Sequence, residues 1–228
     1  MGQNTKEAKD KEKGKIFSKL TRLIAVSVAD GGGVTDPEMN VKLRLAIEKA
    51  KAANMPKENI KRAVEKGSGP ERARLREIIY EGFGPEGVAL LIQTTTDNSN
   101  RTHSEVKNTL EKYGGKMAGQ GSVGYLFQKC GTITFDRKEK KEDEIFSFAD
   151  KVSAFDIEED GTSITLYFPF ESLGKVSGAE PDYKPRSYIK IGDREKAKRV
   201  LATLEKVEEL DDVQRVFANF DIPEEYMT

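Results

Sequence analysis

The stretch "EIIYEGFGPEGVALLIQTTT", residues 77–96, decides the fold of this 228-residue chain. It is rich in β-branched and aromatic residues, and a turn containing Gly84 and Pro85 divides it, so it predicts two strands joined by a hairpin. The residues before it show the spacing of helices instead. The chain therefore changes near Glu77 from a helical part to a part that contains strands.

Helices are predicted throughout the part before the hairpin, and apolar residues at helical spacing mark the buried face of each one. The first helix covers residues 14–30 and ends at glycines 31–33. The second begins at Asp36-Pro37-Glu38, an N-cap followed by proline, and breaks at residues 54–56. The third ends at Gly67. The apolar positions are Ile16, Leu20, Leu23, Ile24, Leu43, Ala46, Ile47, Ala50, Ala53, Ile60, Ala63 and Val64.

Strands and helices alternate after the hairpin. The predicted helices are 97–115, with a capping box at Thr102 and Glu105, then 142–153 and 193–210. The predicted strands are 122–136, 162–170, 185–193 and 213–220. This order favours an α+β fold in which an N-terminal helical domain precedes two units of the split βαβ kind.

The charge of the chain is divided between its two parts. Net charge is -1 overall, but residues 1–76 carry 18 Lys and Arg against 10 Asp and Glu. The remaining residues carry 20 Lys and Arg against 29 Asp and Glu. A basic part of +8 joined to an acidic part of -9 is expected when one end approaches a polyphosphate. A solvated, lysine-rich helical surface would give the same pattern.

Few residues are suited to catalysis or metal binding. Cys130 is the single cysteine and His103 the single histidine, which excludes an internal disulfide and leaves too few soft ligands for zinc. We expect Cys130 to be a buried, inert thiol, and His103, in the first turn of a predicted helix, to have a surface or capping role. Asp211 and Asp212 could bind Mg²⁺, although adjacent carboxylates near a helix end are usually solvated.

The chain also lacks a dinucleotide or P-loop fingerprint. We therefore expect no enzymatic activity, no cofactor and no metal. The apolar runs are too short to span a membrane, and the N-terminus has no signal-peptide core, so we expect no membrane partner and a cytoplasmic protein.

The basic residues of the helical part are the candidate binding site. We expect their side chains to contact phosphates, which positions a protein on nucleic acid without reading its sequence. No helix-turn-helix signature is present, so a structured RNA suits these contacts at least as well as DNA. The candidate nucleic-acid-binding residues are Lys15, Lys19, Arg22, Lys42, Arg44, Lys57, Lys61 and Arg62.

Five segments in order resemble the YebC/PmpR/TACO1 family. They are "GKIFSKLTR", "GGG…DPEMNVKLRLAIEKAKAANMPKENIKRAVEKG", "YEGFGPEGVALLIQTTTDNSNRT", "YGGKMAGQGSVGYLF" and "LDDVQRVFANFDI". The resemblance implies three domains around a cleft: helical residues 1–76, a central ferredoxin-like domain of residues 77–130 plus 186–228, and an inserted ferredoxin-like domain of residues 131–185. Residues 2–15 depart from the basic, tryptophan-bearing segment that opens the family, and residues 169–185 look shorter and less helical than its inserted domain.

The family is described in two ways, which define two hypotheses. The first is a nucleic-acid-binding regulator of gene expression of the DNA-binding, transcriptional type. The alternative is a ribosome-associated translation factor that binds ribosomal RNA. A protein-interaction scaffold, as a third class, would show no salt-dependent binding to nucleic acid.

Overall fold

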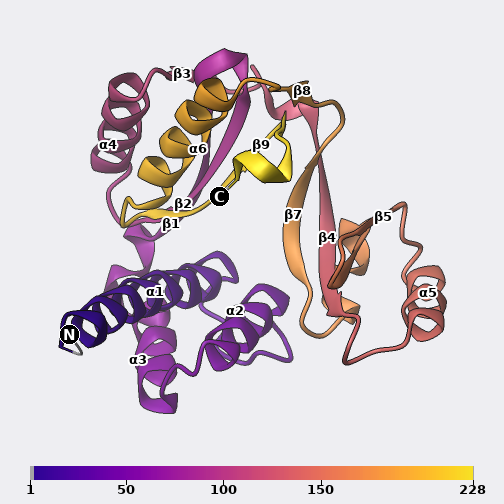
Figure 1. Ribbon diagram of the computed structural model, residues 1–228. Helices are drawn as coiled ribbons and strands as arrows, with labels where there is room; N and C mark the ends of the chain where they lie inside the picture. The colour runs from indigo at the N-terminus through magenta and orange to yellow at the C-terminus, as the bar shows by residue number, and fades with distance from the viewer. Residues whose placement is uncertain (1–2, 228) are drawn as a thin grey trace. The chain divides into compact units, whose positions relative to one another are not determined.

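The computed structural model describes residues 3–227, with side chains from residue 11 onward, as two compact units (Figure 1). The first unit combines the residues up to Leu126 with those from Ser187 onward, and the second unit is Phe127–Arg186. Helices come first and two antiparallel sheets follow, which confirms the predicted α+β class. The three-domain boundaries remain a prediction. No described helix is long and apolar enough to cross a membrane.

The N-terminal helices are α1 (Gln3–Asp30), α2 (Val41–Ala52) and α3 (Lys57–Ser68). The first begins at Gln3 rather than at residue 14. Its residues Leu20, Ile24 and Val28 form a buried cluster with the predicted apolar faces of α2 and α3. Ile16 was predicted to join this cluster, but it is 45% exposed because the cluster begins one residue later, at Phe17.

The start of α2 is set by Asn40 and not, as predicted, by Asp36. Asn40 is buried, its Oδ1 accepts from the Leu43 N–H at 3.1 Å, and its Nδ2 donates to the carbonyls of Ser27 and Val34. Asp36 instead accepts from the Glu38 N–H at 2.9 Å and closes a turn. The N-cap side chain therefore also fixes the loop after α1.

Gly67 lies inside α3 and does not cap it, contrary to the prediction, since the helix continues to Ser68. A Cβ at Gly67 would stand 2.4 Å from the Ala25 carbonyl oxygen and 2.7 Å from the Val28 Cβ. The backbones of α1 and α3 thus approach too closely at this point for any side chain.

We expect Gly67→Ala to lower the free energy of unfolding by about 1 to 2 kcal/mol, because the overpacking penalty exceeds the gain in helix propensity. Gly14→Ala is the matched control, since Gly14 is exposed in α1 with nothing within 4 Å of an added Cβ. That variant should gain up to about 1 kcal/mol. Urea unfolding followed by circular dichroism compares the two, and equal stability of both variants would contradict the close approach.

The central sheet of the first unit confirms the predicted hairpin. Its strands are β1 (Arg76–Phe83), β2 (Ala89–Thr96), β3 (Lys116–Ala118) and β9 (Val213–Ala218), in the order β3-β1-β2-β9 with antiparallel neighbours. Helix α4 (Ser99–Lys112) connects β2 to β3 across β1, which is a split βαβ unit. Helix α6 (Arg194–Glu208) leads into β9, and both helices pack on the sheet through one apolar core (Figure 1).

The beginning of α4 differs from the predicted capping box. Asn98 is the N-cap and accepts from the Arg101 N–H at 3.1 Å. Thr102 is buried, and its hydroxyl bonds to Thr96 and to Asp212. The Thr102 side chain therefore makes a tertiary contact and does not, as predicted, cap the helix.

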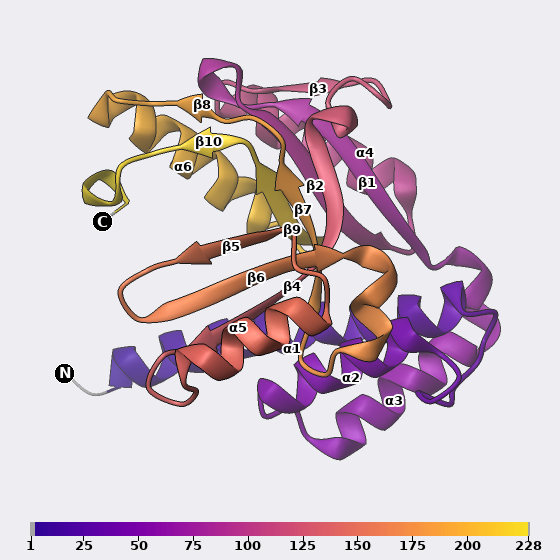
Figure 2. The same cartoon turned by 90° about the vertical axis from the view of Figure 1, so that its right-hand side faces the viewer.

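The second unit is a ferredoxin-like sheet with one helix (Figure 2). Its strands are β4 (Phe127–Asp136), β5 (Asp156–Glu159), β6 (Ser163–Pro169) and β7 (Glu180–Pro185), in the order β5-β6-β4-β7. Helix α5 (Glu142–Lys151) makes the crossover from β4 to β5. The short 3₁₀ segment η4 (Phe170–Lys175) stands where a second helix would be expected, in agreement with the less helical sequence there.

Two smaller predictions are resolved by the same structure. Cys130 is fully buried on β4, as expected. The strand predicted over 185–193 is reduced to β8 (Ile189–Lys190), which pairs in parallel with β10 (Phe220–Asp221).

Candidate nucleic-acid interface

Helix α3 presents three exposed cations of the predicted site. Ile60 and Ala63 face the helical core, which leaves Lys57, Lys61 and Arg62 exposed on the outer side. The Arg62 guanidinium bonds to the Asn59 side chain at 3.3 Å and to the Glu58 carbonyl at 3.4 Å. Within the part of the chain whose side chains are described, no hydrogen bond or ion pair engages the amino groups of Lys57 and Lys61.

This cationic surface continues beyond α3. The segment η1 (Pro70–Arg74) follows directly, and Arg72 and Arg74 are exposed on it. Residues 41–76 together hold 11 Lys and Arg against four Asp and Glu. An excess of this size on one short segment gives a strongly positive local field.

The cations of α2 are partly neutralised. The Lys42 amino group lies 3.0 Å from an Asp30 carboxylate oxygen and 3.7 Å from one of Glu77. Burial lowers the pKa of Lys42, but the two carboxylates outweigh it and raise the pKa above its ordinary value. Arg44 is half-buried and also has an interaction partner. Both residues lie at the N-terminal end of α2, away from the junction with α3.

The three candidate residues on α1 have different environments. Lys15 is exposed, whereas Lys19 donates to the Glu208 carbonyl and Arg22 pairs with the Asp212 carboxylate. Burial lowers the pKa of Lys19 despite the nearby acids Glu208 and Asp211. The reason is that α1 is covered on two sides, by the other helices and by the end of the central sheet.

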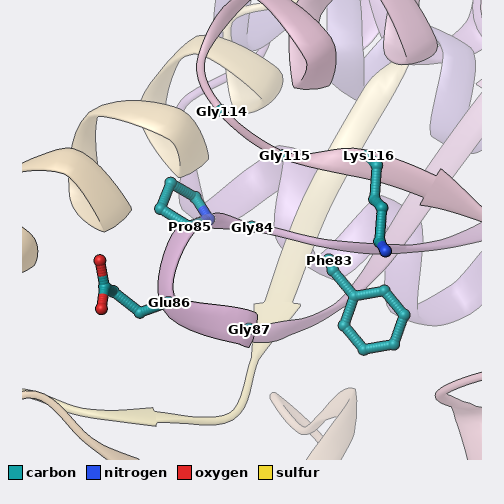
Figure 3. A pocket seen from close by; sticks show the side chains of 8 residues that line it. All are labelled: Phe83, Gly84, Pro85, Glu86, Gly87, Gly114, Gly115 and Lys116. Carbon is teal, nitrogen blue, oxygen red and sulfur yellow. The ribbon is translucent and has the colours of Figure 1, made fainter.

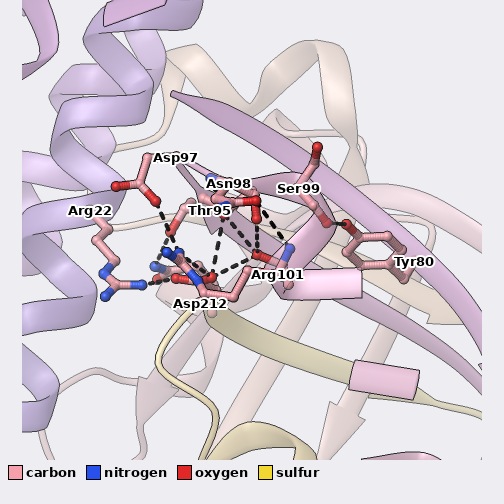
Figure 4. A network of polar contacts seen from close by, with 11 residues as sticks. Arg22, Tyr80, Thr95, Asp97, Asn98, Ser99, Arg101 and Asp212 are labelled. Carbon is pink, nitrogen blue, oxygen red and sulfur yellow. Dashed lines mark hydrogen bonds and ion pairs between the residues drawn. The ribbon is translucent and has the colours of Figure 1, made fainter. Parts of the chain in front are cut away.

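Asp212 is the centre of a buried polar network (Figure 4). Its side chain is 2% exposed and pairs through one oxygen with Arg22. The other oxygen accepts from Arg101 at 2.8 Å, from the Thr102 hydroxyl at 2.7 Å and from the Thr96 hydroxyl at 3.3 Å. The network therefore joins α1, the start of α4 and the turn before β9.

The expectation that the acidic pair at 211–212 is solvated is thus wrong for Asp212, although Asp211 is exposed. Sequence reasoning missed this network because its members are far apart in the chain. The polar run "TTTDNSNRT" (residues 94–102), placed directly after an apolar strand, was the available signal. Among the described residues, no group of three or more His, Cys, Asp or Glu could hold a metal ion.

The eight candidate residues therefore lie in different environments. Lys57, Lys61 and Arg62 share one exposed helix, and Lys15 is exposed on another. Lys42 and Arg44 interact with neighbouring groups, and Lys19 and Arg22 contact the turn before β9. Contact of any of them with nucleic acid remains a prediction.

Comparison with known proteins finds matches over nearly the full length of the chain. A family model of the TACO1/YebC N-terminal domain covers residues 2–70, and a model of the TACO1/YebC second and third domains covers residues 75–220. A probable transcriptional regulatory protein from Aquifex aeolicus is 45% identical over 97% of this chain and 94% of its own length. A probable transcriptional regulatory protein from Halothermothrix orenii is 39% identical over 99% of this chain and 94% of its own length.

A solved structure shows the same fold. The crystal structure of a conserved hypothetical protein from Aquifex aeolicus superposes with a TM-score of 0.84 at 42% identity, covering 94% of this chain and 93% of that one. Sequence relatives, family models and fold agree over nearly the full length. The chain belongs to the TACO1/YebC family.

Proposed function

We propose that this protein is a non-enzymatic, nucleic-acid-binding regulator of gene expression that contacts phosphates through the exposed cations of α3 and η1. The observation that carries the proposal is the cluster of Lys57, Lys61 and Arg62 on one solvent-facing helix surface. Neutralising phosphates with such side chains releases condensed counterions and drives binding. The naming of relatives as probable transcriptional regulatory proteins supports a regulatory role.

The chemistry of the surface favours backbone contacts over base reading. The amides suited to base edges are Asn54 and Asn59, but Asn59 already accepts a bond from Arg62, and Asn54 occupies a turn with φ 58°. Phosphate contacts fix orientation and carry no sequence information. Double-stranded DNA and a structured RNA, including ribosomal RNA, are both compatible with this surface.

The triple variant Lys57→Glu, Lys61→Glu, Arg62→Glu should weaken binding to a mixed-sequence duplex at least tenfold at 0.1 M salt. It should also reduce the slope of log affinity against log salt by about 2 to 3, since up to three phosphate contacts are lost. Fluorescence anisotropy across a salt series measures both quantities. The matched control is Lys138→Glu, Lys151→Glu, Lys175→Glu, which makes the same charge change on exposed lysines of the second unit.

An unchanged affinity and slope in the α3 variant would refute the proposed surface. Equal losses in the two triple variants would mean that net charge, and not this surface, determines binding. The two nucleic-acid classes are separated by sedimenting native protein from lysate on a sucrose gradient, with and without RNase or DNase. Co-migration with ribosomes that only RNase abolishes indicates the translation factor, whereas a light position with salt-sensitive DNA retention indicates the transcriptional regulator.

A further inference from the structure

A pocket of about 420 Å³ lies at the hairpin end of the central sheet (Figure 3). The β1–β2 turn forms one side, through the short 3₁₀ segment η2 (Pro85–Gly87), and the α4–β3 connection forms the other. Phe83, Glu86 and Lys116 contribute side chains, while Gly87, Gly114 and Gly115 contribute bare backbone. The binding surface on α3 does not include this pocket.

The backbone of the pocket adopts conformations that favour glycine. Gly87 and Gly114 have φ of 76° and 86°, and Glu86 takes φ 61°, which is unusual for a residue with a side chain. A Cβ at Gly115 would stand 2.5 Å from the Phe83 carbonyl oxygen. The lack of side chains on these walls lets a ligand approach the main chain closely.

The acidic residue of the pocket lining, Glu86, is neutralised by neighbouring cations. Residues 77–228 carry a net -9, yet Glu86 is paired with both Lys196 at 2.9 Å and Arg199 at 3.2 Å. Lys116 is exposed and, among the residues with described side chains, has no carboxylate partner. Lys116 is therefore the lining cation that is left without a carboxylate, since Lys196 and Arg199 pair with Glu86, and the pocket favours an anionic ligand.

The remaining wall is aromatic. The Lys116 amino group stands 5.7 Å from the centroid of the Phe83 ring, and Phe83 is half-buried at the pocket edge. In Figure 3 the Lys116 side chain points towards Phe83, whereas the Glu86 side chain points away from Phe83. A flat apolar ring beside an unpaired cation matches the two halves of a nucleotide, a base and a phosphate.

We propose that this pocket binds one nucleotide of a single-stranded nucleic acid, with the base against Phe83 and a phosphate on Lys116. A single strand is required because base pairs in a duplex bury the faces that stack on an aromatic side chain. The inference rests on the proposed function and adds a second contact site to it. The pocket lies at the Phe83 end of β1, and the network that holds α1 lies at the opposite end, near Thr96.

The test uses the fact that the chain contains no tryptophan. Phe83→Trp places a single fluorophore in the pocket wall, and a mixed-sequence 16-nucleotide RNA should quench it with the same Kd that anisotropy of the labelled RNA reports. Phe146→Trp, exposed on the second unit, is the control reporter and should not respond.

Lys116→Ala in the otherwise unchanged chain should weaken RNA binding about three- to tenfold and reduce the salt slope by roughly 0.7, the value for one phosphate on a single strand. Lys112→Ala is the matched control, because Lys112 also lies over an aromatic ring, that of Tyr113 at 5.6 Å, and does not line the pocket. It should change the affinity less than twofold.

Failure of the pocket inference and failure of the proposed function give different results in these experiments. If the RNA binds but the Phe83→Trp signal is silent and the two lysine variants behave alike, the pocket inference is wrong and the proposed function stands. If hexaglutamate quenches Phe83→Trp and displaces the RNA from the pocket at equal concentration, the ligand is an acidic peptide and the nucleotide assignment is wrong. If the unmodified protein binds neither the RNA nor a duplex, both proposals fail.

Discussion

Asp212→Ala is expected to lower the free energy of unfolding of the first unit by about 3 kcal/mol. The carboxylate is 2% exposed and is shared by Arg22 and Arg101. Removing one partner of a buried ion pair costs about 3 to 5 kcal/mol, because the remaining charge stays without compensation. The lower value applies here, since both guanidinium groups are partly exposed and water reaches them.

The loss includes the hydroxyls of Thr96 and Thr102, which are buried and donate to Asp212. Thermal unfolding should show a decrease in Tm of roughly 6 to 12 °C. Hydrogen exchange should rise in α1 and β9 and stay unchanged in the second unit, because the network joins only elements of the first.

Asp211→Ala is the control, since it removes the adjacent carboxylate, which is exposed. Its effect should stay within about 0.5 kcal/mol. If the two alanine variants were equally stable, the network would contribute no more than an ordinary surface charge, and α1 would be held in the first unit by its apolar contacts and by the hydrogen bonds of Lys19.

The elements that could be predicted are those whose signal is local. The 77–96 hairpin, the core faces of α2 and α3 and the helices α5 and α6 all follow from periodicity and turn chemistry. The missed details depend on tertiary contacts. Asn40 caps α2 because it also reaches Ser27, and Gly67 stays within α3 because α1 crosses there.

In the candidate site, too, the features with a local signal could be predicted, and those that depend on distant contacts could not. Exposure of Lys57, Lys61 and Arg62 follows from their positions around Ile60, which the helical period supplies. The same period places Arg22 beside the apolar face of α1, but it contains no information about a second covering surface from the C-terminal part of the chain. Asp212 could not be identified as buried, since its partners lie more than 100 residues away along the chain.

Glu81 is a second buried carboxylate whose role depends on contacts distant in sequence. Its side chain is 9% exposed and accepts from the N–H groups of Gly121 at 2.7 Å, Val123 at 2.6 Å and Gly124 at 2.8 Å. Burial raises the pKa of Glu81, but the backbone hydrogen bonds together outweigh it and hold the pKa below its ordinary value. The charged form is therefore favoured by folding and shapes the loop after β3.

Glu81→Gln should lower the free energy of unfolding by about 2 to 4 kcal/mol at pH 7, because an amide bonds less strongly to these N–H groups and turns a donor towards them. A carboxyl whose pKa is depressed by folding stabilises the protein above its unfolded pKa of about 4.3, and this stabilisation is lost as the pH falls through the folded pKa. The difference between the parent protein and Glu81→Gln should therefore shrink steadily below about pH 4.

Glu77→Gln, on the same face of β1 at 25% exposure, should cost less than about 1 kcal/mol at any pH. Urea unfolding of the three proteins at pH 7, 5 and 3.5 measures these differences, and a Glu81→Gln deficit that stays constant with pH would show that shape, and not charge, holds the loop.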